Sequence, residues 1–447
     1  MFVGRPAGAV CQRHRDNPGQ EEGGADVAHV ACQSSCLHRH ARIARERYMQ
    51  RVMKTAGLAA LLTAGLALSA QAADLKIALI TSKTGPLEAY ANQTETGFMM
   101  GLEYMTKGTM TWQGRKIQVI TKDDQLKPDL AKSLLEQAYA DDNVDLAVGT
   151  TGSGGALAML PVAEEYKKIL IVEPAVADAI TGEKWNKYIF RTGRNSSQDA
   201  IAGAAAFPAS GEVSIATLAQ DYAFGRDGVK AMKEALAQIR PNVKIVFEEY
   251  APQQTTDFTA SAQRLFDALK DKPGKRVIAI IWAGPHPLPK IADLKPERFN
   301  IEIAPGGNIL PVMKGYKPYP GMEGAVYYYH DFPKNPINDW FVAEHKKRNN
   351  GNPPDFFTAG GFAAASAALT AVQKAGGTNT DKLIAAMEGM VFDTPKGTML
   401  FRKEDHQALQ QMYHFRVKKD GKDDNDLLEL VQTIQESAMP LPIRNKR

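Results

Sequence analysis

The sequence predicts an α/β protein made of two lobes, each built on a doubly wound parallel sheet. From residue 75 onward, short apolar runs typical of strands alternate with segments whose apolar residues have helical spacing. This alternation occurs twice, over residues 75–172 and over residues 214–303. The length of 447 residues, with 44% hydrophobic and 8% aromatic residues, is that of a globular chain with two or three domains. Alternating strands and helices favour parallel sheets with helices on both faces.

Residues 1–48 are predicted to be unstructured or an over-extended start, with Met49 or Met53 as the true first residue. They contain all three cysteines of the chain and lack both lysine and apolar periodicity. The candidates for a metal cluster there are Cys32, Cys36, His38 and His40. A short Gly- and Arg-rich stretch cannot build the supporting shell that an ion needs. We therefore predict no metal site and no cofactor.

Residues 49–72 are predicted to be a cleavable signal peptide. Arg51 and Lys54 precede a short apolar core, and Ala70 and Ala72 form a small-x-small cleavage site. Cleavage near Ala72-Ala73 would deliver the mature chain to the periplasm.

The alternative for this segment is a membrane anchor. Residues 55–73 carry no charge, and their number approaches the roughly 20 residues of a spanning helix. The segment is Ala-rich and ends in a cleavage site, which favours cleavage. No cysteine stands at the expected mature N-terminus, which argues against a lipid tether.

The net charge of +4 belongs to the first 72 residues. Of the 54 basic and 50 acidic residues, nine basic and five acidic ones precede residue 73, so 45 of each follow it. Nucleic-acid binding rests on clustered positive charge, so we expect no nucleic-acid partner. The remaining chain has no cysteine, and it must be stabilised by core burial rather than by disulfides.

The order of expected elements gives the two lobes. The first set has strands at 75–80, 116–120, 144–148 and 169–172, with helices at 90–105, 129–140 and 156–166. The second has strands at 214–218, 243–246, 277–281 and 300–303, with helices at 228–239 and 257–269. Residues 326–330 and a helix at 358–374 would return the chain to the first lobe, and a strand at 413–417 would cross back. We therefore assign lobe I to residues 73–193 plus about 329–414, and lobe II to 194–328 plus about 415–447.

The most informative loop is residues 149–155 (GTTGSGG), between an expected strand and an expected helix. Backbone N–H groups at a helix N-terminus favour an anion, and glycines let the backbone approach it closely. The hydroxyl of Ser153 adds a donor, so a carboxylate is the natural guest.

Other interpretations of this loop stay open. A P-loop needs a lysine, and none occurs between Leu146 and Tyr166. A nucleophile elbow needs Gly-x-Ser-x-Gly, whereas Thr151 stands at the first position; His406 and His414 follow in the order that a hydrolase requires. A glycine-rich turn that binds nothing is the structural alternative.

Further candidates follow other strands. Residues 173–178 (EPAVAD) come directly after the strand at 169–172, so they can line the same crevice. Aromatic residues in expected loops of both lobes could close on a ligand, although core positions are the commoner fate of any one aromatic. They are Tyr90, Tyr222, Phe224 and Trp282, with His286 nearby.

Taken together, these segments resemble the leucine/isoleucine/valine-binding protein family. The resemblance rests on the exported start and on the order and spacing of several motifs, and it covers residues 74 to about 420. The motifs are the opening Ile77-Ala78-Leu79-Ile80 with Thr84-Gly85-Pro86, the 149–155 loop, Phe190-Arg191-Thr192, residues 221–225 and Asp257-Phe258-Thr259. It implies a type I periplasmic binding fold, with two lobes joined by three crossovers that close on a ligand.

The resemblance also implies a ligand site, carried over position by position. Ser153 stands where a serine holds the ligand carboxylate, Ala175 where a backbone group contributes, and Tyr90 where an aromatic covers the ligand side chain. Phe224 stands at a position that is usually Tyr, and His286 falls close to another. With the loop and aromatic candidates, the predicted ligand-binding residues are Tyr90, Thr151, Ser153, Gly154, Ala175, Ala177, Tyr222, Phe224, His286 and Gly306.

Two departures bear on the ligand. Ala177 replaces a threonine hydroxyl, and Gly306 stands where amino-acid binders carry an acid that pairs with the α-ammonium. A buried ammonium without a counter-charge costs several kcal/mol. We therefore expect a ligand without an α-amino group, such as an aromatic or aliphatic carboxylate or an amide. Glu173 or Asp178 could instead supply the missing charge, which keeps amino acids open.

The sequence thus predicts a monomeric, non-enzymatic periplasmic substrate-binding protein that delivers a small amino acid or carboxylate to an ABC permease in the inner membrane. The alternatives are a secreted serine hydrolase using Ser153 and a ligand-sensing receptor module.

Overall fold

The computed structural model describes residues 73–446, so the predicted start and signal segments lie outside it. Lobe I is built on a six-stranded sheet in the order β2-β3-β1-β4-β5-β6, parallel except for the β2–β3 pair. Its strands are β1 (Leu75–Thr81), β2 (Thr111–Trp112), β3 (Arg115–Asp123), β4 (Leu146–Gly149), β5 (Leu170–Val172) and β6 (Ile189–Arg191). Its helices are α2 (Glu88–Met105), α3 (Pro128–Ala140), α4 (Ser153–Tyr166), α11 (Phe356–Ala375) and α12 (Thr380–Met387).

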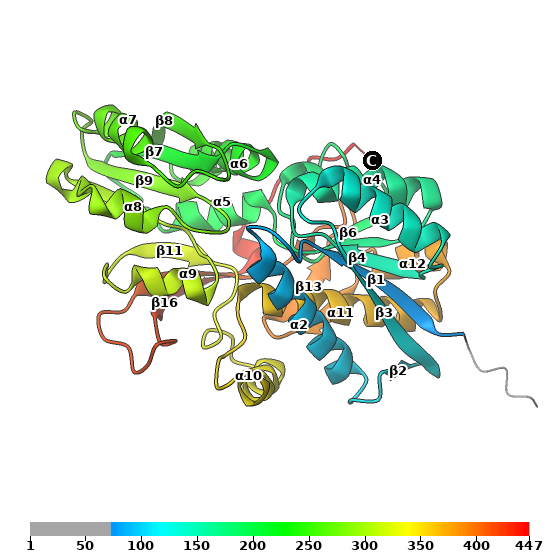
Figure 1. The fold of residues 1–447 in the computed structure, drawn as a ribbon. Coiled ribbons are helices and arrows are strands. Elements are labelled where there is room, and N and C mark those ends of the chain that lie inside the picture. Colours follow the sequence, from blue (N-terminus) through cyan, green and yellow to red (C-terminus); the bar gives the residue numbers. More distant parts are fainter. Residues whose placement is uncertain (1–72, 447) are drawn as a thin grey trace, which may run out of the picture. The chain divides into compact units, whose positions relative to one another are not determined.

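Helices cover both faces of this sheet, with α3 and α4 on one face and α2 and α11 on the other (Figure 1). Glycines allow α2 and α11 to pack closely: a Cβ built at Gly97 would lie 1.8 Å from the carbonyl oxygen of Thr358. Among residues 73–446, α11 alone is long and apolar enough to cross a membrane, but 89% of its apolar window is buried. It is the central core helix of lobe I.

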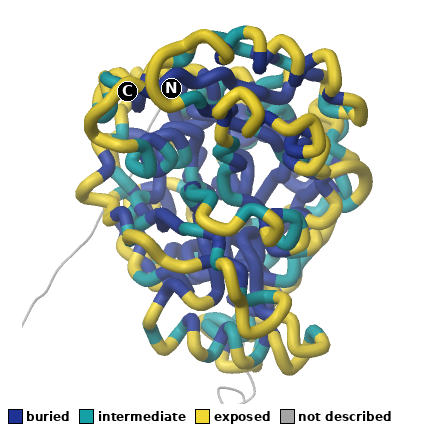
Figure 2. The backbone as a smooth tube through the Cα atoms, turned by 90° about the vertical axis from the view of Figure 1, so that its left-hand side faces the viewer, coloured by how far each residue is buried: buried dark blue, intermediate teal, exposed yellow. Residues whose placement is uncertain are grey.

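Lobe II contains two sheets, a parallel one in the order β10-β9-β7-β8 and an antiparallel one in the order β11-β15-β16. The strands are β7 (Val213–Gln220), β8 (Val243–Ala251), β9 (Lys275–Ile281), β10 (Ile301–Ala304), β11 (Glu323–Val326), β15 (Met412–Val417) and β16 (Leu428–Ile434). The helices are α5 (Ser196–Ala205), α6 (Ala223–Ile239), α7 (Thr259–Leu269), α8 (Leu288–Asp293) and α9 (Leu310–Met313). Viewed from the lobe II side, buried segments run through the centre and exposed turns surround them (Figure 2).

The remaining elements lie between or beside these layers. They are the hairpin sheet β12 (Val391–Thr394), β13 (Gly397–Phe401) and β14 (Ala408–Leu409), helix α10 (Pro336–Arg348), and the short 3-10 turns η1 (Asp178–Ile180), η2 (Pro296–Phe299), η3 (Lys314–Tyr316) and η4 (Glu436–Ala438). The hairpin packs against α11 in lobe I.

The expected elements all have counterparts, and several others were not predicted. Strand β6 is only three residues long, and α5 is Ala-rich with a weak apolar period, so neither has a strong periodic signal. A capping box, Asn195 with Gln198, does mark the start of α5 and was available in the sequence. Helix α4 begins at Ser153 rather than near residue 156, so part of the glycine-rich loop is the first helical turn.

Three crossovers join the lobes, after β6, after β11 and before β15. They lie together: Gln410 Nε2 donates to the carbonyl oxygen of Thr192 at 3.1 Å, and the Arg194 guanidinium lies 5.8 Å from the ring centroid of Tyr327. Segments distant in sequence therefore meet at one hinge.

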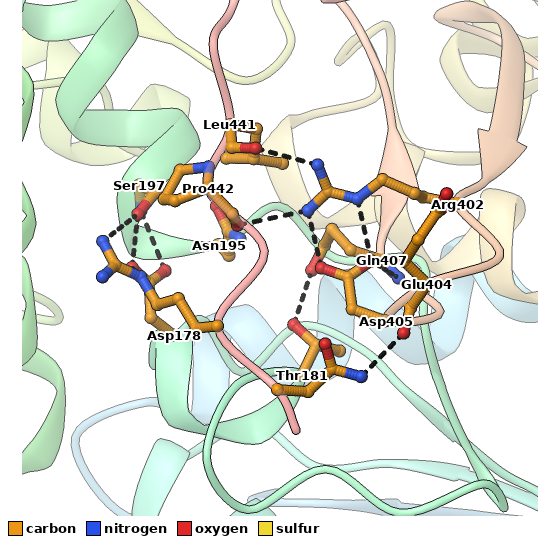
Figure 3. Close-up of polar contacts among 12 residues, drawn as sticks. Asp178, Thr181, Asn195, Ser197, Arg402, Glu404, Asp405, Gln407, Leu441 and Pro442 are labelled. Carbon is orange, nitrogen blue, oxygen red and sulfur yellow. Dashed lines mark hydrogen bonds and ion pairs between the residues drawn. The ribbon is translucent and has the colours of Figure 1, made fainter. Parts of the chain in front are cut away.

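The segment after β16 returns from lobe II to lobe I and contacts both (Figure 3). On the lobe I side, Arg402 Nη1 donates to the carbonyl oxygen of Leu441 at 2.8 Å. Arg444 Nε lies 3.2 Å from Asp178 Oδ2, and its guanidinium also pairs with Glu234 of α6 in lobe II. The C-terminal segment is thus a fourth link between the lobes.

Candidate ligand-binding cleft

The carboxyl ends of the parallel strands of both lobes form a cleft. In lobe I the strand order reverses at β1, so the loops after β1 and β4 adjoin, and Ser82 N donates to Thr151 Oγ1 at 3.0 Å. In lobe II the order reverses at β7, and Gln220 at its end exchanges two hydrogen bonds with Ala283 after β9, at 2.9 and 3.0 Å. Ligands of open α/β sheets bind at such switch points.

The two lobes contact each other through Tyr90 of α2. Its hydroxyl donates to Asn308 Oδ1 at 2.8 Å and accepts from Gly284 N at 2.8 Å, and both partners belong to lobe II. Burial raises the pKa of Tyr90 to about 12, so the hydroxyl stays neutral and fills both roles. Tyr90 therefore closes one side of the cleft.

A cavity of about 850 Å³ begins in this cleft, which is within the range of small-molecule sites. The predicted residues that line it are Tyr90, Thr151, Ser153, Tyr222, Phe224 and Gly306. The predicted residues that are not among its lining are Gly154, Ala175, Ala177 and His286. A ligand contact by any of the ten stays a prediction.

Extended backbone explains why Ala175 and Ala177 do not line the cavity. Pro174 and Val176 line the cavity instead, because alternate residues of an extended segment point to opposite sides. Ala177 still acts on the site through its backbone, since its N–H donates to Ser153 Oγ at 3.3 Å.

His286 is held by its own loop. Nδ1 accepts from Leu288 N at 3.1 Å, so Nε2 carries the proton and donates to the carbonyl oxygen of Pro305 at 3.1 Å. Burial lowers its pKa to about 4, which keeps the ring neutral. Gly154 lies on the α3 side of α4, where an added Cβ would meet Pro128 at 3.4 Å.

Ser153 and Thr151 are set to donate hydrogen bonds into the cavity. Each hydroxyl oxygen accepts a backbone N–H, from Ala177 and Ser82 respectively, which leaves its O–H as the group to be partnered. No side chain caps the N-terminus of α4, so the first N–H groups of the helix also face this region. This arrangement favours an anion.

Arg194, in the first crossover, is the cation of the cleft and was not predicted. Its guanidinium lies 4.6 Å from the ring centroid of Phe356 and 5.6 Å from that of Phe357, and its Nε donates to Asp199 Oδ1 at 3.1 Å. Both Arg194 and Asp199 line the cavity. A lone arginine outside any motif gave no signal, because only the crossover geometry brings it to the cleft.

Tyr327, in the second crossover, adds a hydroxyl. Its side chain is 2% exposed, it lines the cavity, and its OH has no hydrogen-bond partner among the described residues. A buried hydroxyl left unpaired is costly, so a ligand group is its natural partner. Phe357 completes the apolar wall, with its ring 4.3 Å from that of Tyr90.

The two acids expected as substitute counter-charges are engaged elsewhere. Glu173 accepts from Thr192 Oγ1 at 3.0 Å. Asp178 accepts from Ser197 N at 3.0 Å and from Ser197 Oγ, and it pairs with Arg444. Neither acid is among the residues that line the cavity.

In the part of the chain that the structure describes, the two histidines that follow Ser153 in hydrolase order are engaged elsewhere. His406 Nδ1 lies 2.8 Å from the carbonyl oxygen of Ile189, and His414 pairs with Glu323 at 2.9 Å. Nucleophilic catalysis needs a base within hydrogen-bond reach, so the hydrolase alternative has no support. Within residues 73–446, no group of three or more His, Cys, Asp or Glu could hold a metal.

Two doubly wound lobes, with a cavity between their switch points and hydrogen-bond donors at its cleft end, define a small-molecule binding protein. The family model for periplasmic binding proteins matches residues 74–422, and the chain belongs to that family. It is a substrate-binding protein of the ABC-transporter type, not an enzyme.

Similar proteins include transporter components and solute-binding proteins. A structure of an ABC-type branched-chain amino acid transporter from Rhodopseudomonas palustris CGA009 is 68% identical, covers 84% of this chain and 100% of its own, and has a TM-score of 0.74. The leucine-, isoleucine-, valine-, threonine- and alanine-binding protein of Pseudomonas aeruginosa is 25% identical over 77% of this chain and 90% of its own length. A solute-binding protein from Rhodopseudomonas palustris BisB5, in complex with 3,4-dihydroxybenzoic acid, is 27% identical, covers 82% and 99%, and has a TM-score of 0.69.

Proposed function

We propose that this protein binds a carboxylate with an apolar or aromatic body and no α-ammonium, and delivers it to an ABC permease of the inner membrane. The lobes close on the ligand, and the closed surface is the one that the permease recognises. The ligand-binding residues are Tyr90, Thr151, Ser153, Tyr222 and Phe224 from the predicted set, with Arg194 and Tyr327 added.

The charge balance of the cleft carries this proposal. Arg194 and the hydroxyls of Ser153 and Thr151 offer donors, and Asp199 already accepts from Arg194. Gly306 brings no acid to the position where an ammonium would need one. The other acids of the cavity wall, Glu297, Glu302 and Glu323, lie in η2 or toward the amino ends of β10 and β11, away from the cleft.

The bound 3,4-dihydroxybenzoic acid of the BisB5 relative supports an aromatic carboxylate. The names of the other two relatives support a branched-chain amino acid, which is the second candidate. Asp199 favours the amino-acid candidate, because the ammonium of an amino acid would pair with this carboxylate beside Arg194. We further propose that the mature protein is a periplasmic monomer, exported through cleavage near Ala72-Ala73.

Isothermal titration with benzoate, 3,4-dihydroxybenzoate and leucine tests the ligand class on the mature chain. We expect the two carboxylates to bind and leucine to bind at least tenfold more weakly, because a buried ammonium without a free acid is costly. Tight leucine binding without carboxylate binding would overturn the proposal.

The same titration tests whether Arg194 contacts the ligand. Arg194→Met should weaken carboxylate binding by about 10- to 100-fold, because a charge-assisted hydrogen bond contributes about 1.5–3 kcal/mol. Arg226→Met is the matched control, since Arg226 pairs with Asp221 at the surface and is not among the cavity-lining residues. Equal effects of the two substitutions would count against a ligand contact by Arg194.

A further inference from the structure

The cavity does not end in the cleft but continues along lobe II. Alternate residues of β9, Lys275, Val277, Ala279 and Ile281, all line it. Alternate residues of a strand share one face, so the cavity follows this face for the whole strand. Six residues of rise give it a length of about 20 Å.

Residues of α5 and α6, several of them small, form the opposite wall. Helix α5 and its C-terminal extension line the cavity with Ser196, Ala200, Gly203 and Phe207, which recur at helical spacing. A Cβ built at Gly203 meets no atom within 4 Å, so open space lies directly over this position. Helix α6, which packs against α5, adds Gly228 and Met232. It closes on β9 at the cleft end of the strand, where a Cβ built at Gly228 would lie 2.9 Å from the side chain of Ile281.

A break between the two sheets of lobe II forms the third wall. Among the described strands, β10 pairs only with β9, and β11 pairs only with β15, so each has a free edge. Ile301 and Ile303 of β10 and Gly324 and Ala325 of β11 line the cavity. Figure 1 shows α5 between β9 and β11.

The two ends of this space differ in chemistry. The cleft end has Ser153 and Arg194. The outer end has an ion pair between Lys275 Nζ and Glu302 Oε2 at 2.8 Å, together with the acids Glu297 and Glu323. The wall between them is made mainly of aliphatic residues and glycines. A volume of about 850 Å³ is near the top of the range for drug-sized ligands.

We propose that the space along β9 is a channel for the hydrocarbon part of an elongated carboxylate, whose head group is held at Ser153 and Arg194. This inference rests on the proposed carboxylate function and narrows it to amphipathic acids with a straight aliphatic or aryl-alkyl tail. The tail runs past Gly306 toward Lys275, and the ion pair marks the solvent end.

Titration with a series of straight-chain carboxylates from butanoate to dodecanoate, together with benzoate and 3-phenylpropanoate, tests the channel. We expect affinity to rise about fourfold for each added methylene, because each buried CH₂ adds a constant increment. The rise should continue through dodecanoate, because the extended chain of this acid is shorter than the channel of about 20 Å.

Gly203→Leu should block the channel without disturbing the fold, because leucine favours a helix and its Cβ has room. We expect it to abolish the gain with chain length and to leave benzoate affinity within twofold of wild type. Gly203→Ala is the control: it raises helix propensity at least as much without filling the space, and it should keep the chain-length dependence.

The outcomes separate the two proposals. Benzoate binding with no gain for longer acids, or a gain that Gly203→Leu leaves unchanged, overturns the channel and leaves the carboxylate function standing. Leucine binding with no carboxylate binding overturns both.

Discussion

At the residue scale, the hinge contains a buried carboxyl, Glu173, among positive charges. It accepts a hydrogen bond from Thr192 and packs so closely on α11 that a Cβ built at Gly360 would lie 2.1 Å from Glu173 Oε1. Burial raises its pKa to about 7; the Thr192 hydrogen bond and the charges of Arg194, Lys396 and Arg191 oppose the rise. The carboxyl therefore titrates near neutral pH.

Glu173→Gln should make stability less dependent on pH. In the native protein the carboxyl binds its proton up to about pH 7, and in the unfolded chain only up to 4.5. Wild-type stability therefore falls as pH rises from 4.5 to 7, by about 3 kcal/mol. Urea unfolding should show the variant to be more stable than wild type at pH 8 and equal to it at pH 4.

The control for this substitution is Glu436→Gln, an exposed acid in η4 that should change stability little at any pH. A Glu173→Gln effect of the same size at pH 4 and pH 8 would show that packing, rather than ionisation, is responsible.

At the element scale, the C-terminal segment holds residues of both lobes. The last few residues of the chain contact Arg402 and Asp178 in lobe I and Ser197 in lobe II (Figure 3). They also contact Glu234 in lobe II. A link of this kind favours the arrangement in which all its contacts form at once, which is the one with the lobes together.

Arg444→Ala should therefore lower the apparent affinity for the ligand. Loss of a partly exposed ion pair amounts to about 1 kcal/mol, which is about fivefold in affinity if the closed form loses it. Arg416→Ala is the control, because Arg416 pairs with Glu323 and Glu429 within lobe II. Titration with benzoate measures both variants, and an equal loss in both would rule out a role specific to the link.

At the scale of the whole molecule, binding and closure are one equilibrium. Tyr90 joins the lobes by two hydrogen bonds, and Asp355, the N-cap of α11, adds a third by accepting from Leu310 N at 2.7 Å. These bonds exist only when the lobes meet, so they set the fraction of closed molecules before ligand binds.

Tyr90→Phe should shift the molecule toward the open form, because Gly284 N loses its acceptor and Asn308 Oδ1 loses a donor. The expected cost is about 1–3 kcal/mol, or roughly 5- to 150-fold in affinity. Small-angle scattering should show a larger radius of gyration without ligand than wild type has. Tyr104→Phe is the control, since its ring packs on Trp340 and Phe362 within lobe I. An unchanged radius and affinity in Tyr90→Phe would show that Tyr90 does not govern closure.

The sequence by itself determined the elements and the place of the glycine-rich loop at the cleft. Apolar periodicity is a local property, so the strands, the helices and the position of Ser153 after β4 could be predicted. In the short segment after β5, the sequence did not show which of the alternating side chains face the cavity. The structure shows that Pro174 and Val176 line it, rather than their alanine neighbours.

Only the tertiary structure decided what meets at the cleft and how far the cavity extends. Arg194 and Tyr327 lie far apart in sequence and come together because two crossovers run side by side. The channel depends on a break between β10 and β11 and on small residues of α5 facing β9. Such features arise from the packing of distant segments, and no local pattern records them.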